Sequence, residues 1–196
     1  MVKGIFTQNR KKLTGILPFF LVVFLYPGVS RADDIRWNEV KTKHTIIRYQ
    51  ADKDLKDFDR KIDYSAVSSS PDLDLLISGP DNGDLKKKII NKVDAIYRRV
   101  QEILGMRKAM DRVKVNIYRD SADLKKAFYD IYKKEGKLRA WYIYEYNTIY
   151  INVKDLHEGM LAHEIAHSII DHYLSVRPPS ASAEILARYV DSHLMR

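Results

Sequence analysis

The pentapeptide His163-Glu164-Ile165-Ala166-His167 is the stretch from which the fold and the site of this protein can be worked out. On a helix, residues four apart lie one turn apart on the same side, so the two imidazoles face the same way with Cβ atoms roughly 5 to 6 Å apart. Each ring can then offer one nitrogen to a single ion. Glu164 projects beside that ion rather than onto it. The spacing predicts two metal ligands, His163 and His167, and one general base, Glu164.

The residues around the motif argue against a pair of ordinary surface histidines. Leu161, Ile165 and Ile169 form an apolar side of the helix, and the small Ala162 and Ala166 permit close packing. Two histidines and a glutamate inside such a segment are costly to bury without a partner. Cysteine is absent, so any metal must be held by His, Asp or Glu.

A catalytic zinc ion needs a third protein ligand and an open position. Glu184 lies 17 residues after His167, in the first turn of a helix that the Pro178-Pro179 break allows to fold back onto the motif helix. We expect Glu184 to be this ligand and one catalytic Zn²⁺ to be the cofactor. Glu184 and Arg188 also have the spacing of an ordinary surface ion pair. The alternative ligands are Asp191 and His172.

Residues 1–32 are typical of a secretory signal peptide. Basic residues precede an apolar run from Leu13 to Val29, and Ser30-Arg31-Ala32 has the small residues that a signal peptidase requires. The run is shorter than the roughly 20 apolar residues of a membrane-spanning helix, and prolines interrupt it. We expect cleavage before Asp33 and export to the bacterial periplasm or exterior, without stable membrane insertion. The alternative is a retained N-terminal anchor.

The net charge of +8 does not indicate a nucleic-acid-binding protein. Residues 1–32 hold five basic residues and no acidic one, so the mature chain of about 164 residues carries only about +3. This balance is too mild to imply a polyanionic partner. We expect a peptide or protein substrate and no nucleic acid, while the oligomeric state stays open.

The segments around the motif predict a single α+β domain over residues 33–196, with helices packed on a mostly antiparallel or mixed sheet. Residues 65–84 contain turn-forming clusters and are expected to be a surface insertion. The polar stretch 51–60 carries no predicted element. Strands are expected at 44–49, 113–118, 140–146 and 148–153, and helices at 84–104, 121–136, 156–174 and 180–194. The expected boundary residues are Gly105 at the end of the first helix, Ser121 as cap of the second, and Ser180 or Ser182 as cap of the last.

HEIAH followed by a helix-borne glutamate resembles the gluzincin division of the zincin metallopeptidases, especially the compact bacterial peptidase MA-like families. The segment Pro178–Tyr189 is similar to the family segment in which a proline-containing loop leads into the ligand glutamate. The resemblance implies a zincin-like fold, with a small mixed sheet on the motif helix and a C-terminal glutamate helix. It also implies a secreted zinc-dependent endopeptidase that hydrolyses peptide bonds with metal-bound water activated by Glu164. In that group the strand before the motif helix forms the sheet edge, here Asn147–Val153, along which a peptide would bind.

The sequence departs from that group in ways that leave the surroundings of the ligands open. Ile170 and Tyr173 stand where the related metzincin pattern has Gly and His, which disfavours that class. Ile185 replaces a common glycine, and Arg188 replaces an acidic residue. Larger relatives stabilise the oxyanion with a residue from a further domain. In this protein we expect the stabilising residue to come from the peptidase domain itself. The candidates, by position only, are Tyr142, Tyr144, Tyr146, Tyr150, Tyr173 and Tyr189.

Two other functions fit the same residues. The first is a non-catalytic zincin-like module that retains its metal for binding or regulation. The second is an exported structural domain in which HEIAH is coincidental. Metal content and peptide cleavage separate these from a peptidase.

Overall fold

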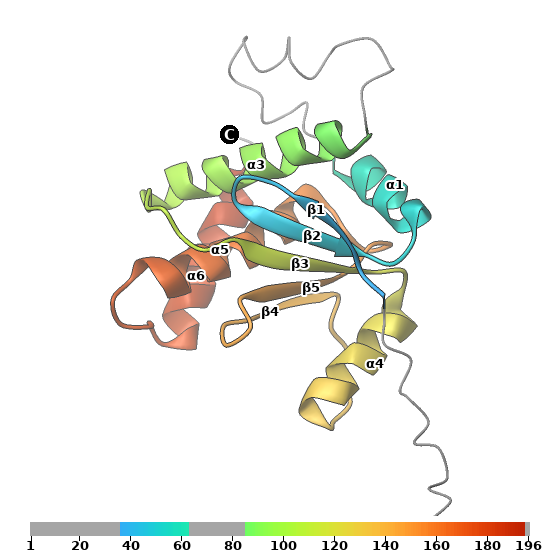
Figure 1. The fold of residues 1–196 in the computed structure, drawn as a ribbon. Helices are drawn as coiled ribbons and strands as arrows, with labels where there is room; N and C mark the ends of the chain where they lie inside the picture. Colours follow the sequence, from blue (N-terminus) through green and yellow to red (C-terminus); the bar gives the residue numbers. More distant parts are fainter. Residues whose placement is uncertain (1–35, 63–84, 195–196) are drawn as a thin grey trace, which may run out of the picture. The chain divides into compact units, whose positions relative to one another are not determined.

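A computed structural model describes residues 36–62 and 85–194 (Figure 1). These residues belong to one structural unit. The predicted signal peptide (1–32) and the predicted insertion (65–84) lie outside the described residues. Among the described helices, none is both long enough and apolar enough to cross a membrane.

Within the described residues, five strands form one mixed sheet in the order β1-β2-β3-β5-β4. The strands β2, β3 and β5 run parallel, while β1 pairs antiparallel with β2 and β4 pairs antiparallel with β5. The predicted α+β class with a mixed sheet is therefore confirmed. The strands are β1 (Asn38–Lys41), β2 (Thr45–Tyr49), β3 (Val113–Tyr118), β4 (Ala140–Ile143) and β5 (Thr148–Asn152).

The strand before the motif helix lies inside the sheet, so the prediction that residues 147–153 form its edge is wrong. In β5, Ile149 lies opposite Val115 of β3 and opposite Tyr142 of β4. All five residues of β5 are buried. A strand with apolar residues suited to burial on both faces is favoured in the interior of a sheet. In the hairpin of β4 and β5, β5 is therefore the inner strand and β4 is the edge strand.

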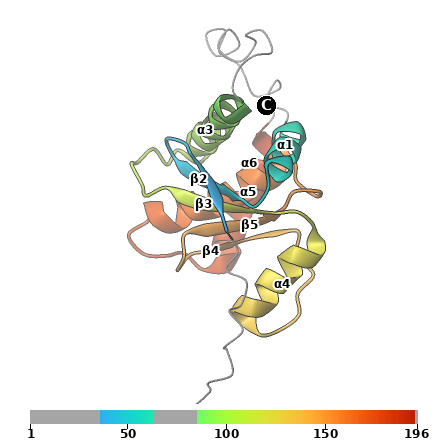
Figure 2. The same cartoon turned by 45° about the vertical axis from the view of Figure 1, so that its right-hand side comes forward.

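Helices cover both faces of the sheet, but unequally. The helices α1 (Asp52–Lys61), α3 (Leu85–Leu104), α5 (Glu158–Tyr173) and α6 (Ser180–His193) share the main core with one face. The remaining described helix, α4 (Ser121–Tyr132), lies on the other face (Figure 2). It packs there against a second, mainly aromatic cluster of buried side chains. That cluster includes Trp141, stacked on Tyr150 with ring centroids 4.7 Å apart. The motif helix α5 is thus held against the larger core.

The structure adds two elements that their polar composition conceals, β1 and α1. In α1, which falls on the stretch without a predicted element, Leu55 and Phe58 are buried. The backbone N–H of Ala51 donates to Asp54 Oδ2 at 3.1 Å and so stabilises the start of the helix. Two apolar residues are too few for a clear helical period, so tertiary packing supplies most of the stability of α1.

The predicted helix boundaries are partly correct. Gly105 ends α3 with φ +66°, a conformation that glycine adopts without strain. The cap of α4 is Asp120 rather than Ser121, because its carboxylate accepts from two backbone N–H groups at 3.0 and 3.1 Å. That helix ends at Tyr132 rather than 136, because Lys133 adopts a left-handed φ of 53°. The predicted serine cap of the last helix is wrong, since its N-cap is Pro179.

The helix α6 packs back against α5 through small side chains, as the Pro178-Pro179 break predicts. The buried residues of α6 include Ala183 and Ala187, and those of α5 include Ala162 and Ala166. Small side chains allow two helix backbones to approach closely. This close approach carries Glu184 to the motif histidines. Because α6 begins at Ser180, Glu184 lies in the second turn of the helix rather than in the predicted first turn.

Replacing Ala187 by leucine is expected to destabilise the domain by about 1–3 kcal/mol, because added methylenes in a filled helix contact force neighbouring groups apart. Ala187 is fully buried (0% exposed). Urea denaturation followed by circular dichroism measures the change. The matched control is Ile185→Ala on the same helix, where the side chain is 68% exposed and a change within about 0.5 kcal/mol is expected. Equal stability of Ala187→Leu and the wild type would contradict this packing.

Candidate metal centre

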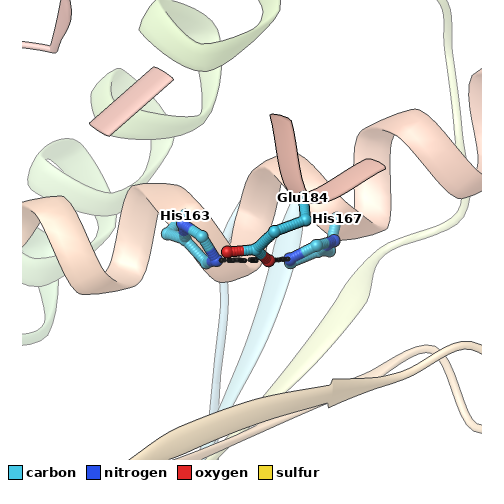
Figure 3. Close-up of side chains that lie close together, drawn as sticks. All are labelled: His163, His167 and Glu184. Atoms are coloured by element: carbon cyan, nitrogen blue, oxygen red, sulfur yellow. Dashed lines mark hydrogen bonds and ion pairs between the residues drawn. The ribbon is translucent and has the colours of Figure 1, made fainter. Parts of the chain in front are cut away.

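Three side chains from two helices point toward one another (Figure 3). The Nε2 atoms of His163 and His167, both on α5, are 3.2 Å apart. Oε2 of Glu184, on α6, lies 3.5 Å from Nε2 of His163 and 3.4 Å from Nε2 of His167. The fold therefore brings together the three residues predicted as metal ligands. The ligand atoms of these three residues all lie within 4.8 Å of one another. No other group of three His, Asp or Glu residues in the described part of the chain meets this condition.

The triangle formed by these donor atoms has the size of one face of a tetrahedral zinc shell. Bonds of roughly 2.0–2.2 Å at tetrahedral angles place neighbouring donors about 3.3 Å apart. The observed edges are 3.2, 3.4 and 3.5 Å. The two nitrogen–oxygen separations exceed the usual range of about 2.7–3.2 Å for N–H···O hydrogen bonds. The two Nε2 atoms are within hydrogen-bond distance of each other. The three donor atoms together also have a spacing that could hold a single cation.

The electrostatics of His167 favour metal binding. Burial lowers the pKa of His167, and the neighbouring His163 lowers that pKa further. Neutral imidazole is the form that binds a metal. A proton on His167 therefore competes weakly with a cation near neutral pH.

Arg188 holds the carboxylate of Glu184 from the side away from the histidines. Its Nε donates to Glu184 Oε1 at 2.7 Å, while Oε2 of the same carboxylate lies near the two imidazoles. This hydrogen bond is the main cause that lowers the pKa of Glu184. Glu184 thus belongs both to a surface ion pair and to the ligand triangle. The sequence leaves open whether Glu184 is a metal ligand or part of a surface ion pair with Arg188, and the geometry is compatible with both.

Glu164 lines the same cleft as the ligands and is buried, with 8% exposure. Burial, and then the nearby charge of Glu184, raise the pKa of Glu164 to about 8. No cation among the described residues opposes this shift. A pKa near neutrality suits a group that both accepts and releases a proton. A cation held by the triangle would supply the positive charge that the ionised carboxylate lacks.

The metal-free protein is expected to lose stability as the pH rises from about 4.5 to about 8. The folded state holds the proton of Glu164 more tightly than the unfolded chain, whose pKa is near the ordinary 4.5. The contribution of protonated Glu164 to the free energy of unfolding is therefore fully present below pH 4.5. It is lost as the pH rises to about 8, by at most about 1.4 kcal/mol per pH unit. Urea denaturation of the chelator-treated protein and of Glu164→Gln between these pH values isolates the effect. The same pH dependence in both proteins would contradict it.

The two alternative ligands lie elsewhere in the fold. The carboxylate of Asp191 lies beside Gly159, in the first turn of α5. Nε2 of His172 is 2.9 Å from the hydroxyl of Tyr142. Neither residue belongs to the converging group. This geometry leaves Glu184 as the third candidate ligand.

The remaining histidines have structural contacts. His157 caps α5, because its Nδ1 accepts from a backbone N–H at 3.2 Å. The rings of His44 and Tyr97 are parallel, with centroids 4.4 Å apart. The ring of His193 stacks on Tyr189 at 4.0 Å.

A set of polar contacts fastens the edge hairpin to the motif helix. Ser168 of α5 donates to Asn147 Oδ1 at 3.1 Å, and the hydroxyl of Tyr142 donates to the same oxygen at 3.3 Å. The hydroxyl of Tyr142 also contacts His172. These contacts hold β4 beside the ligand pair. Of the six candidate tyrosines, Tyr142 lines the cleft, but its hydroxyl is engaged in this set.

A cleft of about 930 Å³ opens over the triangle. One wall is β4, from Ala140 to Tyr142, and the other is the segment from Arg177 to Ala181 before and within the start of α6. Asp171 and Arg177 also line it, although no sequence argument singled them out. Asp171 lies four residues after His167, so the helical spacing could have revealed it. Arg177 lies in a loop and carries no such signal.

No protein-family model or curated protein matches this sequence, and no solved structure matches its fold. The class of the site follows from its own residues. The two histidines of HEIAH lie on one helix, and a glutamate from the following helix lies next to them. This arrangement could hold one metal ion.

Proposed function

We propose that this protein is an exported zinc-dependent endopeptidase with a zincin-like domain. The observation that carries the proposal is the convergence of His163, His167 and Glu184 at tetrahedral spacing, beside a buried glutamate that lines the same cleft. The nitrogen and oxygen donors suit zinc. When bound there, zinc would act as a Lewis acid on the water and the substrate carbonyl. This leaves proton transfer and substrate alignment to the protein.

Glu164 moves the proton in this proposal. As a carboxylate it accepts a proton from the water that attacks the carbonyl carbon, and as an acid it donates that proton to the departing nitrogen. Its buried position keeps bulk water from replacing it in either step.

The peptide is proposed to lie along β4 rather than along β5. An extended chain binds a sheet by adding a strand to an open edge. Both sides of β5 are already paired, whereas β4 is the last strand in the order and lines the cleft with Ala140, Trp141 and Tyr142. A strand added to β4 would carry its scissile carbonyl over the ligand triangle. Because β4, and not β5, is the outer strand, the proposed peptide-binding strand changes from β5 to β4.

Export and the choice of substrate rest on the sequence. Residues 1–32 have the composition of a signal peptide, and without them the net charge is only about +3. This charge supports a peptide or protein substrate over a nucleic acid.

The test is the zinc content of the purified protein and its cleavage of a mixed peptide library. We expect about one equivalent of zinc, and cleavage that a chelator abolishes and added zinc restores. Bound zinc without cleavage of any peptide would contradict the peptidase and favour the non-catalytic metal-binding module. Purified protein with little zinc would favour a structural domain in which HEIAH is coincidental.

A further inference from the structure

Arg177 places a positive charge in the wall of the metal cleft. It lies in the loop between α5 and α6, directly before Pro178-Pro179, and lines the cleft together with the ligand triangle. Its side chain is 51% exposed, so solvent and a bound peptide can reach it. The two prolines beside it have no backbone N–H groups to offer an anion. Among the residues of this wall, from Arg177 to Ala181, the guanidinium is the charged donor of hydrogen bonds.

Two contacts fix the orientation of this guanidinium. Nε donates to Asp171 Oδ2 at 3.0 Å, and the Asp171 side chain is only 5% exposed. The guanidinium carbon lies 4.6 Å from the centre of the Tyr144 ring. An arginine held by a carboxylate and an aromatic face loses little freedom when it binds a ligand. Asp171 and Tyr144 thus hold the Arg177 guanidinium in one orientation before a ligand binds.

The terminal nitrogens of Arg177 keep binding capacity. Nη1 forms an ion pair with Glu145 Oε1 at 3.9 Å, a separation longer than a hydrogen bond. Glu145 is itself 67% exposed. A carboxylate matches the fork of two guanidinium N–H groups and binds it in a bidentate manner.

The remaining charges of the cleft make Arg177 decisive for an acidic ligand. Glu164, Asp171 and Glu184 also line the cleft. Glu184 pairs with Arg188, and Asp171 pairs with Arg177. A divalent cation on the triangle would add positive charge beside Glu164 and Glu184. Without Arg177, Asp171 would lose this ion pair, and its negative charge would oppose a substrate carboxylate in that wall.

From this geometry we infer that Arg177 binds a carboxylate of the substrate, so that the enzyme prefers peptides with an acidic side chain or a free C-terminus near the scissile bond. The inference rests on the proposed peptidase function. A purely structural role is the rival, because the contact with Asp171 also fastens the α5–α6 loop. The two roles differ in outcome, since loss of a fastener slows the cleavage of every peptide alike.

The experiment compares kcat/KM for matched peptides that differ in one carboxylate. One pair has Glu or Gln beside the scissile bond, and a second pair has a free or an amidated C-terminus. The proteins are the wild type, Arg177→Gln and Arg177→Lys, with Arg107→Gln as a control for net charge. Arg107 is 72% exposed and does not line the metal cleft. Zinc content and Tm of each variant show whether it is folded.

For the wild type we expect about 10- to 100-fold higher kcat/KM for the acidic member of one pair, the range of a charged hydrogen bond. Arg177→Gln should bring that ratio close to one while cleavage of the neutral peptide persists. Arg177→Lys should keep part of the preference, and Arg107→Gln all of it. The pair that responds identifies the source of the carboxylate.

Several results would overturn the inference. Cleavage of acidic and neutral peptides at equal rates by the wild type would refute it and leave the peptidase proposal standing. An unchanged preference in zinc-loaded Arg177→Gln, or an equal loss on both peptides, would assign Arg177 a structural role only. Absence of any cleavage by the wild type would refute the proposed function and this inference together.

Discussion

Replacing Glu164 by glutamine is expected to slow peptide cleavage by about 10²- to 10⁴-fold while the zinc content stays the same. Glutamine has nearly the same size as glutamate, so it fills the same buried place beside the ligands, but it cannot accept and return a proton. The variant avoids the cost of burying a carboxylate, so its fold should be retained. The expected loss is therefore in kcat rather than in metal binding.

Single-turnover and steady-state cleavage of one well-cleaved peptide measure this effect, with zinc determined on the same samples. The matched control is Glu102→Gln on α3, the same chemical change at a glutamate that is 47% exposed and does not line the cleft. It should cleave at the wild-type rate. Full activity of zinc-loaded Glu164→Gln would exclude Glu164 as the general base.

Replacing His167 by alanine is expected to remove most of the zinc-dependent increase in thermal stability. For the wild type, free zinc at 100 to 1,000 times its Kd would stabilise the folded state by about 2.7–4.1 kcal/mol. For a domain of this size, this corresponds to a rise in Tm of roughly 5–15 °C. Without His167, two of the three converging donors remain, so zinc binds too weakly to shift Tm in the same way.

Differential scanning calorimetry with added zinc and with a chelator measures the difference. The control is His193→Ala on α6, a histidine outside the converging group, which should keep the full response to zinc. An equal zinc-induced shift in His167→Ala and in the wild type would place the zinc elsewhere. A wild type without any shift would refute a metal centre at the triangle.

The motif helix and its ligand pair could be predicted because the signal is local. The spacing of His163 and His167 places them on one side of a helix whatever lies around it. Their neighbours Leu161, Ile165 and Ile169 are completely buried, as their period predicts. Glu184 could be expected in the same region because a proline break turns the chain back. Its approach to the histidines also needs the small residues of both helices, which the sequence does contain.

Other features of the site depend on distant segments. The contact of Arg177 with Asp171 depends on the path of the loop after α5. The inward position of β5 depends on parallel pairing with β3, whose residues lie more than thirty positions earlier in the sequence. The edge strand beside the metal centre could therefore be predicted as one arm of a hairpin, but not as the outer arm.

Local sequence patterns were enough to predict a helix with two adjacent imidazoles and a carboxylate, the alternating strands, and the return of a second helix carrying Glu184. The outer position of β4 among the described strands, the helix α1, and the place of Arg177 in the cleft emerge only in the folded chain. The difference lies in the range of the interactions. Helical and strand periods depend on residues within a turn or two, whereas strand order and loop path depend on which distant surfaces bury the most apolar area together.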